Sequence, residues 1–110
     1  MIIALDYDGT FTEDPALWTA FIDSCISKGH RVVMVTMRFA SEGIGSNEHI
    51  VGHEHVFYTG RTAKKQFMTT LGIHPHVWID DHPQSVFMDA EQIWGVSLPE
   101  GRTDSRNAVR

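Results

Sequence analysis

The stretch that decides the fold is IIALDYDGT, residues 2–10, in which a short apolar run is followed at once by acidic residues and a glycine. Short, partly β-branched apolar runs are typical of strands buried in a parallel sheet, so we predict that this run forms one. Gly9 lets the backbone turn sharply after the acidic pair. Strand alternation then places Asp6 and Asp8 on a common side, with Tyr7 opposite.

Outward from this stretch, apolar runs alternate with amphipathic ones. Strands are predicted over residues 1–5, 31–36, 56–58, 77–79 and 93–98. Helices are predicted over residues 14–29, 62–71 and 84–90. Residues 39–50 stay ambiguous, because Gly43, Gly45 and Ser46 interrupt any helix there. The alternation predicts an α/β fold: a three-layer, Rossmann-like parallel sheet with helices on both faces.

The first helix has the clearest start signal. Asp14 stands at the cap position, Pro15 at the first helical position, and Gly29 ends the helix. Six residues at helical spacing are expected to face the core: Leu17, Trp18, Phe21, Ile22, Cys25 and Ile26. Cys25 is the only cysteine, so no intramolecular disulfide forms and a reducing compartment is expected.

The length and composition indicate one compact domain. The chain has 110 residues, of which 42% are hydrophobic, including three Trp and six Phe, enough for one core. We assign residues 1–98 to this core domain. Residues 99–110 are polar and rich in turn formers, so we expect an exposed tail there.

Nine Lys and Arg against fourteen Asp and Glu leave a formal net charge of −5. An acidic chain repels nucleic-acid phosphates and anionic membranes, so a sequence-independent nucleic-acid binder is disfavoured. No apolar stretch approaches the roughly 20 residues that a membrane span needs. Asp6 and Asp8 interrupt the apolar start before it resembles a signal peptide. We therefore expect a soluble, cytoplasmic protein.

Residues just after the strands should carry the chemistry, because ligands of open parallel sheets bind beyond the carboxyl ends of the strands. These positions hold Asp6, Asp8, Thr36, Arg38, Asp80 and Asp81, and Lys64 opens a later helix. Two like charges at about 4 Å repel by roughly 4 kcal/mol at an effective dielectric near 20. Four carboxylates at one rim therefore need shared protons or a hard divalent cation, above all Mg²⁺.

This residue set suits phosphoryl transfer. One carboxylate of the Asp6 and Asp8 pair can attack phosphorus, while its neighbour protonates the leaving oxygen and later takes a proton from water. Thr36, Lys64 and Arg38 can donate hydrogen bonds and positive charge to the phosphoryl oxygens.

Four motifs follow one another between residues 2 and 81: DYDGT at residues 6–10, RVVMVT ending at Thr36, KKQFMTTLGI beginning at Lys64, and VWIDD at residues 77–81. In this order they resemble the first to fourth motifs of the haloacid dehalogenase superfamily of phosphohydrolases, whose first motif is DxDGT. The agreement of four motifs, each at a strand end or helix start, is more specific than any one of them.

The resemblance implies an aspartyl-phosphate mechanism. Asp6 would be the nucleophile and a Mg²⁺ ligand. Asp8 would be the general acid and base, with its backbone carbonyl on the metal. Asp81 resembles the family's metal-binding acid after the apolar strand, which leaves Asp80 as a direct or water-mediated second ligand.

The resemblance also implies a phosphate-binding set made of Gly9, Thr36, Arg38 and Lys64. Lys64 is preferred to Lys65, because the family places its Lys seven residues before the Leu of an LGI ending. Arg38 resembles an Arg of polynucleotide 3′-phosphatases in the same superfamily. A 3′-phosphatase or nucleotidase is therefore the alternative activity.

The family's larger members insert a cap domain after the first motif or between the second and third, where this chain has room only for loops. We expect a capless enzyme with an open site, which suits a large phosphorylated substrate and also admits small phosphate esters. No membrane partner is expected, and nucleic acid only as a substrate end. The oligomeric state stays open.

Two other function classes compete with an enzyme of this kind. A receiver-type signalling domain uses similar residues around Mg²⁺, but its adjacent acids follow the first strand, whereas the adjacent pair of this chain comes last. A noncatalytic binding module could keep the fold, although the complete set of motif residues argues against it.

Seven histidines are many for this length. The pairs His53 with His55 and His74 with His76 could each share a strand face and bind zinc or nickel. We favour surface histidines that flank strands, since neither pair has a cysteine or a third ligand nearby.

Overall fold

A computed structural model of the chain describes residues 1–95 and divides the molecule into two compact units. The first unit comprises Met1–Thr36, Ile44–Phe57 and His74–Asp81. The second comprises Met37–Gly43, Tyr58–Ile73 and the segment that begins at His82.

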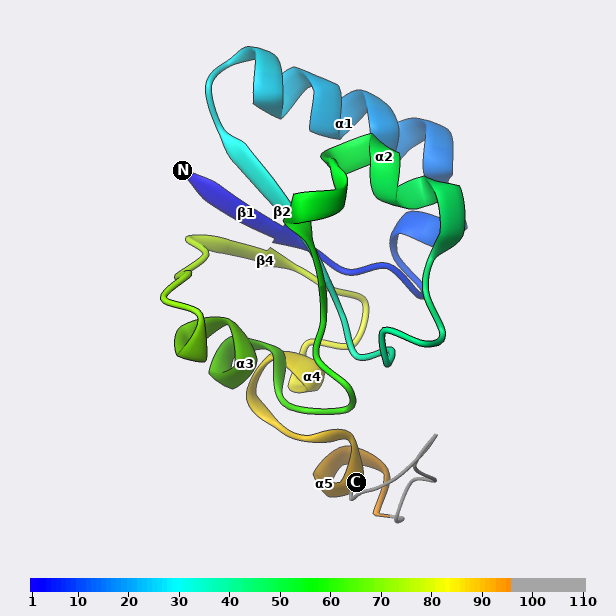
Figure 1. The fold of residues 1–110 in the computed structure, drawn as a ribbon, viewed down its shortest axis with the longest axis vertical. Helices are drawn as coiled ribbons and strands as arrows, with labels where there is room; N and C mark the ends of the chain where they lie inside the picture. Colours follow the sequence, from blue (N-terminus) through cyan, green and yellow to red (C-terminus); the bar gives the residue numbers. More distant parts are fainter. Residues whose placement is uncertain (96–110) are drawn as a thin grey trace. The chain divides into compact units, whose positions relative to one another are not determined.

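The fold is α/β and is built on a four-stranded parallel sheet (Figure 1). The strands are β1 (Ile2–Leu5), β2 (Arg31–Thr36), β3 (Val56–Tyr58) and β4 (Val77–Ile79), in the spatial order β3-β2-β1-β4. These four strands confirm the sequence prediction, and β2, β3 and β4 have the predicted bounds. Apolar runs were sufficient to find them, although only β1 and β2 are mostly buried: β3 is intermediate throughout and Val77 of β4 is exposed.

Strand β1 is central because it pairs with β2 on one side and with β4 on the other. Leu5, its last residue, lies opposite Met34 of β2 and Ile79 of β4. Leu5 and Met34 are fully buried. The chain therefore leaves β1 from the middle of the apolar core, and the residue that follows begins in a buried position.

Helix α1 (Pro15–Ser27) begins as predicted: the side chain of Asp14 accepts a hydrogen bond from the backbone N–H of Leu17 at 3.1 Å. The predicted core face is partly wrong. Ile22 and Cys25 are buried, whereas Leu17 and Ile26 are 55% and 49% exposed. The apolar stripe of the sequence is thus wider than the face that the helix buries.

The ambiguous stretch after β2 contains the 3₁₀ turn Gly45–Asn47 and the short helix α2 (Glu48–Val51). Helix α2 contacts both α1 and β2, and α1 also contacts β2, so the two helices lie together on one face of the sheet (Figure 1). A further 3₁₀ turn, His53–His55, leads into β3.

The second unit contains the helices α3 (Lys64–Thr70), α4 (Gln84–Phe87) and α5 (Ala90–Trp94). Two predictions fail here. The helix expected over residues 84–90 stops at Phe87, because Met88 has extended backbone angles. The strand expected over residues 93–98 is wrong at its start, since Trp94 ends a helix and Gly95 follows in the left-handed conformation.

A capping box explains the last helix. Gln92 accepts a hydrogen bond at 2.8 Å from the backbone N–H of Asp89, the residue that precedes α5. Residues 96–98 of the expected strand and the whole predicted tail, residues 99–110, lie outside the described residues. Within residues 1–95, no helix combines the length and the apolar character that crossing a membrane requires.

Candidate metal centre

The acidic residues follow strands at the point where the strand order reverses. From β1 the chain proceeds outward through β2 to β3, and it then returns to the opposite side of β1 with β4. Ligand sites of open α/β sheets form at such a switch point, beyond the carboxyl ends of the strands. Asp6 follows β1, and Asp80 and Asp81 follow β4. A hydrogen bond of 2.9 Å from the Asp6 N–H to the Ile79 carbonyl joins the two strand ends.

Three carboxylates meet at this point. Asp6, Asp80 and Asp81 each offer an oxygen atom, and these atoms lie within 4.8 Å of one another. Asp6 is only 7% exposed, whereas Asp81 is exposed and Asp80 is intermediate. At that separation each ionised pair repels by about 3 kcal/mol at an effective dielectric of about 20. A bound cation would relieve this repulsion, and carboxylate oxygens are the donors that hard divalent cations prefer.

Thr10 links the carboxylates. Its hydroxyl lies 3.1 Å from Oδ2 of Asp6 and 3.2 Å from Oδ1 of Asp81, and it accepts a hydrogen bond of 3.1 Å from the Asp81 N–H. A hydroxyl has one proton, so it donates to one carboxylate at a time. Thr10 is buried and holds the turn after β1 against the residue after β4.

Gly9 is required by the geometry of the acidic group. Its φ of +84° is one that side-chain-bearing residues rarely adopt. A Cβ atom at this position would lie 2.3 Å from Oδ2 of Asp81. The turn can therefore approach the Asp81 carboxylate only because residue 9 has no side chain.

The expected alternation around Tyr7 is wrong. Strand β1 ends at Leu5, so the next residues form a turn and no longer alternate between faces. Asp6 and Tyr7 are both buried, whereas Asp8 is exposed and is not one of the three grouped carboxylates. The Tyr7 hydroxyl accepts a hydrogen bond of 2.8 Å from Asn47, and the Tyr7 ring stacks on Phe11. These contacts anchor the turn.

The two lysines of the third motif have different surroundings. Lys64 is the first residue of α3 and is only 2% exposed. Lys65 is exposed, and its Nζ lies 5.7 Å from the centroid of the Phe87 ring. An ammonium group at the positive end of a helix dipole is electrostatically unfavourable, so a buried Lys64 requires compensating acceptors. Thr36, at the end of β2, is likewise buried.

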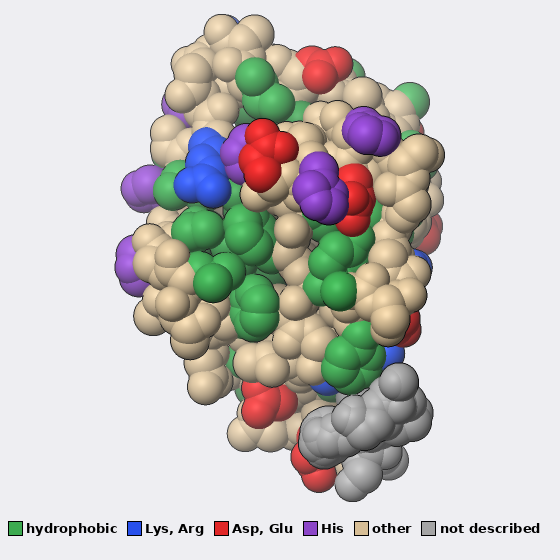
Figure 2. Space-filling model, in the orientation of Figure 1, with side chains coloured by type: hydrophobic (Ala, Val, Ile, Leu, Met, Phe, Trp, Pro, Cys, Tyr) green, Lys and Arg blue, Asp and Glu red, His purple; other side chains and the backbone are tan. Residues whose placement is uncertain are grey.

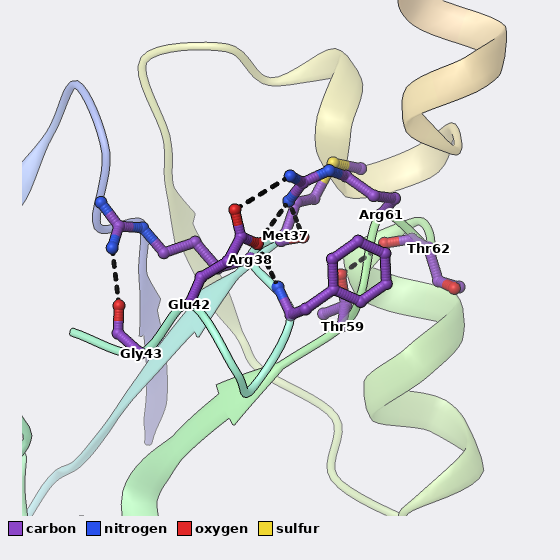
Figure 3. A network of polar contacts seen from close by, with 8 residues as sticks. Met37, Arg38, Glu42, Gly43, Thr59, Arg61 and Thr62 are labelled. Atoms are coloured by element: carbon purple, nitrogen blue, oxygen red, sulfur yellow. Dashed lines mark hydrogen bonds and ion pairs between the residues drawn. The ribbon is translucent and has the colours of Figure 1, made fainter. Parts of the chain in front are cut away.

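Arg38 belongs to a polar network in the second unit, shown in Figure 3. Its guanidinium donates a hydrogen bond of 2.6 Å to the Gly43 carbonyl. Arg61 donates to both carboxylate oxygens of Glu42 at 3.1 Å and to the Met37 carbonyl at 2.8 Å. Glu42 in turn accepts from the Phe39 N–H at 2.6 Å. The backbone carbonyls at both ends of the segment Met37–Gly43 thus accept hydrogen bonds from arginine side chains.

The charges of this network compensate one another. Burial raises the pKa of Glu42, but the hydrogen bonds from Arg61 and Phe39 and the charges of the two arginines outweigh it, so the pKa lies below its usual 4.5. Arg61 has a φ of +74°, and its guanidinium lies 4.9 Å from the centroid of the Phe39 ring. The segment that carries Arg38 is therefore held by side-chain hydrogen bonds to its backbone.

The histidines of the two predicted pairs lie at or near the surface: His53, His74 and His76 are exposed and His55 is intermediate. His53 pairs with Glu48 at 2.6 Å, and His76 Nδ1 accepts from the Ile2 N–H at 2.9 Å. Figure 2 shows histidine side chains at several places on one face, some beside acidic ones. His53 and His55 lie in a 3₁₀ turn rather than on a strand. Among residues 1–95, the one group of three potential metal ligands contains no histidine.

Sequence reasoning missed three residues around the acidic group. Thr10 is part of the DYDGT motif, so its position was a usable signal. Glu13 and Trp18 line a hollow together with Asp80 and Asp81. Trp18 was assigned to the core because helical spacing does not distinguish a residue at the edge of the buried face from one at its centre.

Comparisons of the chain with protein-family models, with curated proteins and with solved structures gave no match.

Proposed function

We propose that the chain is a Mg²⁺-dependent phosphomonoester hydrolase of the haloacid dehalogenase type. The observation that carries the proposal is the group formed by Asp6, Asp80 and Asp81 at the strand-order switch point, with ligand atoms within 4.8 Å. Motif order supports it, because these acids occupy the first and fourth motif positions that the sequence resembles.

In the proposed reaction the Asp6 carboxylate attacks phosphorus, and the bond between phosphorus and the leaving oxygen breaks. Asp8 gives its proton to that oxygen. Asp8 then takes a proton from water, which attacks the aspartyl phosphate and releases inorganic phosphate and the Asp6 carboxylate.

A divalent cation bound by the three carboxylates would neutralise charge and hold the phosphoryl group in place. The donor set fits a hard cation because it consists of oxygen ligands alone. Thr10 would keep Asp6 and Asp81 in position through its hydroxyl.

Thr36, Lys64 and Arg38 retain the phosphate-binding roles proposed from the sequence. The burial of Lys64 and the contact of Lys65 with Phe87 favour Lys64 as the phosphate-binding lysine. The alternative of a polynucleotide 3′-phosphatase rests on Arg38 alone, and a substrate panel that includes 3′-phosphorylated oligonucleotides distinguishes it.

The test is hydrolysis of an activated aryl phosphate by the wild-type chain and by Asp6→Asn, each with Mg²⁺ and with chelator. An activated leaving group reduces the dependence on substrate identity. We expect turnover only in the wild type with Mg²⁺, and a loss in Asp6→Asn on the order of a thousandfold or more.

Asp23→Asn is the matched control, because Asp23 is an exposed carboxylate of α1. It should retain full activity. Wild-type turnover in chelator, or full turnover by Asp6→Asn, would contradict the proposal. Folded protein that binds Mg²⁺ but hydrolyses no phosphomonoester would favour a noncatalytic binding module instead.

A further inference from the structure

A hollow of about 300 Å³ lies beside the acidic group, within the first unit. Its lining includes Asp80 and Asp81 after β4, Thr10 from the turn after β1, and Trp18 from α1. This volume is at the lower end of the range for small-molecule sites, which is about 300–1,000 Å³. The hollow therefore suits a small group rather than a large cofactor.

One wall of the hollow is aromatic. Trp18 is half-buried, and its ring makes an edge contact with Phe21, with 5.6 Å between the ring centroids and an interplanar angle of 82°. The indole therefore packs on one side against Phe21 and lines the hollow. Ile79 adds an aliphatic surface to the lining.

Three of the residues that line the hollow are acidic. Glu13, the last residue of the 3₁₀ turn Phe11–Glu13, lines the hollow with Asp80 and Asp81, and its side chain is exposed. Within the described part of the chain, no lining residue is basic. If Asp80 and Asp81 bind a metal ion, Glu13 still contributes a negative charge that the metal does not need.

An indole ring together with carboxylates is complementary to an organic cation. The indole face attracts an alkylammonium through the quadrupole of the ring, and carboxylates attract it by charge. A neutral aromatic group would use the ring but would gain nothing from Glu13. A second phosphate group would be repelled by the acidic wall.

We propose that this hollow binds an alkylammonium group, such as that of an amino alcohol, on the leaving-group side of the substrate. The inference deepens the proposed phosphatase function and rests on it: the preferred substrates are phosphomonoesters of small cationic alcohols. The two chemistries lie side by side because Asp80 and Asp81 belong both to the metal-ligand group and to the lining of the hollow.

The test compares choline with 3,3-dimethylbutan-1-ol, its neutral isostere, in the presence of Mg²⁺. Binding is followed through the indole N–H signal of Trp18 in nuclear magnetic resonance spectra, assigned with Trp18→Phe. We expect choline to bind at least about tenfold more tightly than the isostere, the difference expected from one charge over an indole.

Two variants locate the binding. Glu13→Gln removes one charge from an exposed side chain and should weaken choline binding severalfold without affecting the fold. Trp18→Leu keeps the apolar bulk and should weaken choline more than the isostere. Asp23→Asn, on the same helix but outside the hollow, should leave choline binding unchanged.

This binding experiment needs no turnover, so it separates the two proposals. Equal affinity for choline and its isostere, or choline binding that Glu13→Gln leaves intact, would overturn the inference. If choline binds as expected but no phosphomonoester is hydrolysed, the cation site stands as a binding site and the phosphatase fails. If the phosphatase is active, phosphocholine should exceed 3,3-dimethylbutyl phosphate in kcat/KM by about tenfold.

Discussion

The turn after β1 lies where three carboxylates meet, whereas in the segment after β2 a carboxylate pairs with an arginine. In the first, Asp6 and Asp81 share the hydroxyl of Thr10, and three carboxylates lie within 4.8 Å. In the second, Glu42 is met by both terminal nitrogens of Arg61. Charge that is balanced inside the fold has a structural explanation. Three carboxylates that meet at a switch point form the oxygen-ligand set of a candidate cation site, and this arrangement distinguishes them from an ordinary ion pair.

The largest expected difference between the two segments is in Mg²⁺ affinity, when one carboxylate of each is neutralised. Asp81→Asn and Asp80→Asn each remove a proposed ligand. Losing a residue that only supports a metal ligand costs up to about a hundredfold in metal affinity, so we expect the apparent Mg²⁺ affinity of each variant to fall by about that much. Glu42→Gln should leave it unchanged. Titration calorimetry with Mg²⁺ measures all three.

The same titration addresses which acid is the direct ligand. An effect confined to Asp81→Asn would make Asp80 a water-mediated ligand. If Glu42→Gln and Asp81→Asn lowered the Mg²⁺ affinity equally, the acidic group would not be a specific cation site.

A second comparison concerns glycine. Gly9→Ala combines an unfavourable φ with a Cβ atom 2.3 Å from Asp81, so we expect a loss of about 3 kcal/mol in the free energy of unfolding. Gly29→Ala has nearly the same φ, +86°, but meets nothing within 4 Å. It should cost about 1 kcal/mol.

Urea denaturation of both variants gives the difference, which isolates the collision with Asp81. Equal stability of the two variants would contradict the close approach of Gly9 to the Asp81 carboxylate.

The balanced segment should respond weakly to pH. Because the folded-state pKa of Glu42 is lowered, its contribution to stability is present above the unfolded value of about 4.5 and is lost as pH falls through the folded value. Its side chain is 41% exposed, so we expect less than about 1 kcal/mol after solvent screening.

Thermal unfolding of wild type and Glu42→Gln from neutral pH to acid measures this. The two curves should converge at low pH. Curves that stayed parallel would show that the ion pair with Arg61 contributes nothing that depends on ionisation.

The smallest effect is expected at His53. The hydrogen bond to Glu48, followed by the charge of that carboxylate, raises the pKa of the exposed His53 above its usual 6.5. The contribution of this ion pair to folding stability is fully present below the ordinary pKa of histidine and is lost as pH rises through the raised pKa. Glu48→Gln should return the pKa of His53 to its usual range, as followed by the ring proton signals, while leaving Mg²⁺ binding at the acidic group unchanged.

The sequence was sufficient for the four strands and for the start of α1, because buried apolar runs and an Asp-Pro cap are local signals. It was also sufficient to bring Asp6 next to Asp80 and Asp81, since those residues follow strands that turned out to be neighbours. Strand order and the points where β1 and β4 end bring these three acids to one place, and Gly9 and Thr10 complete the approach.

Other features depended on contacts that a local pattern does not contain. The position of Asp8 follows from β1 ending at Leu5, so the alternation of a strand does not extend over residues 6–8. Helix α5 covers the first two residues of the strand expected over residues 93–98, although Asp89 and Gln92 have the spacing of a capping box and could have signalled the helix. Asp89 also accepts from the Ala63 N–H at 2.8 Å, a link across 26 residues that no local reading anticipates.

The central claim, that Asp6 is a nucleophile, is tested most directly by trapping the phosphorylated chain. Wild type and Asp8→Asn are mixed with the activated aryl phosphate and Mg²⁺, quenched in acid, digested, and analysed by fragmentation mass spectrometry. We expect one phosphoryl group on Asp6, more abundant in Asp8→Asn because water attack is slowed, and none in Asp6→Asn. A phosphoryl group on any other residue, or its persistence in Asp6→Asn, would contradict the account.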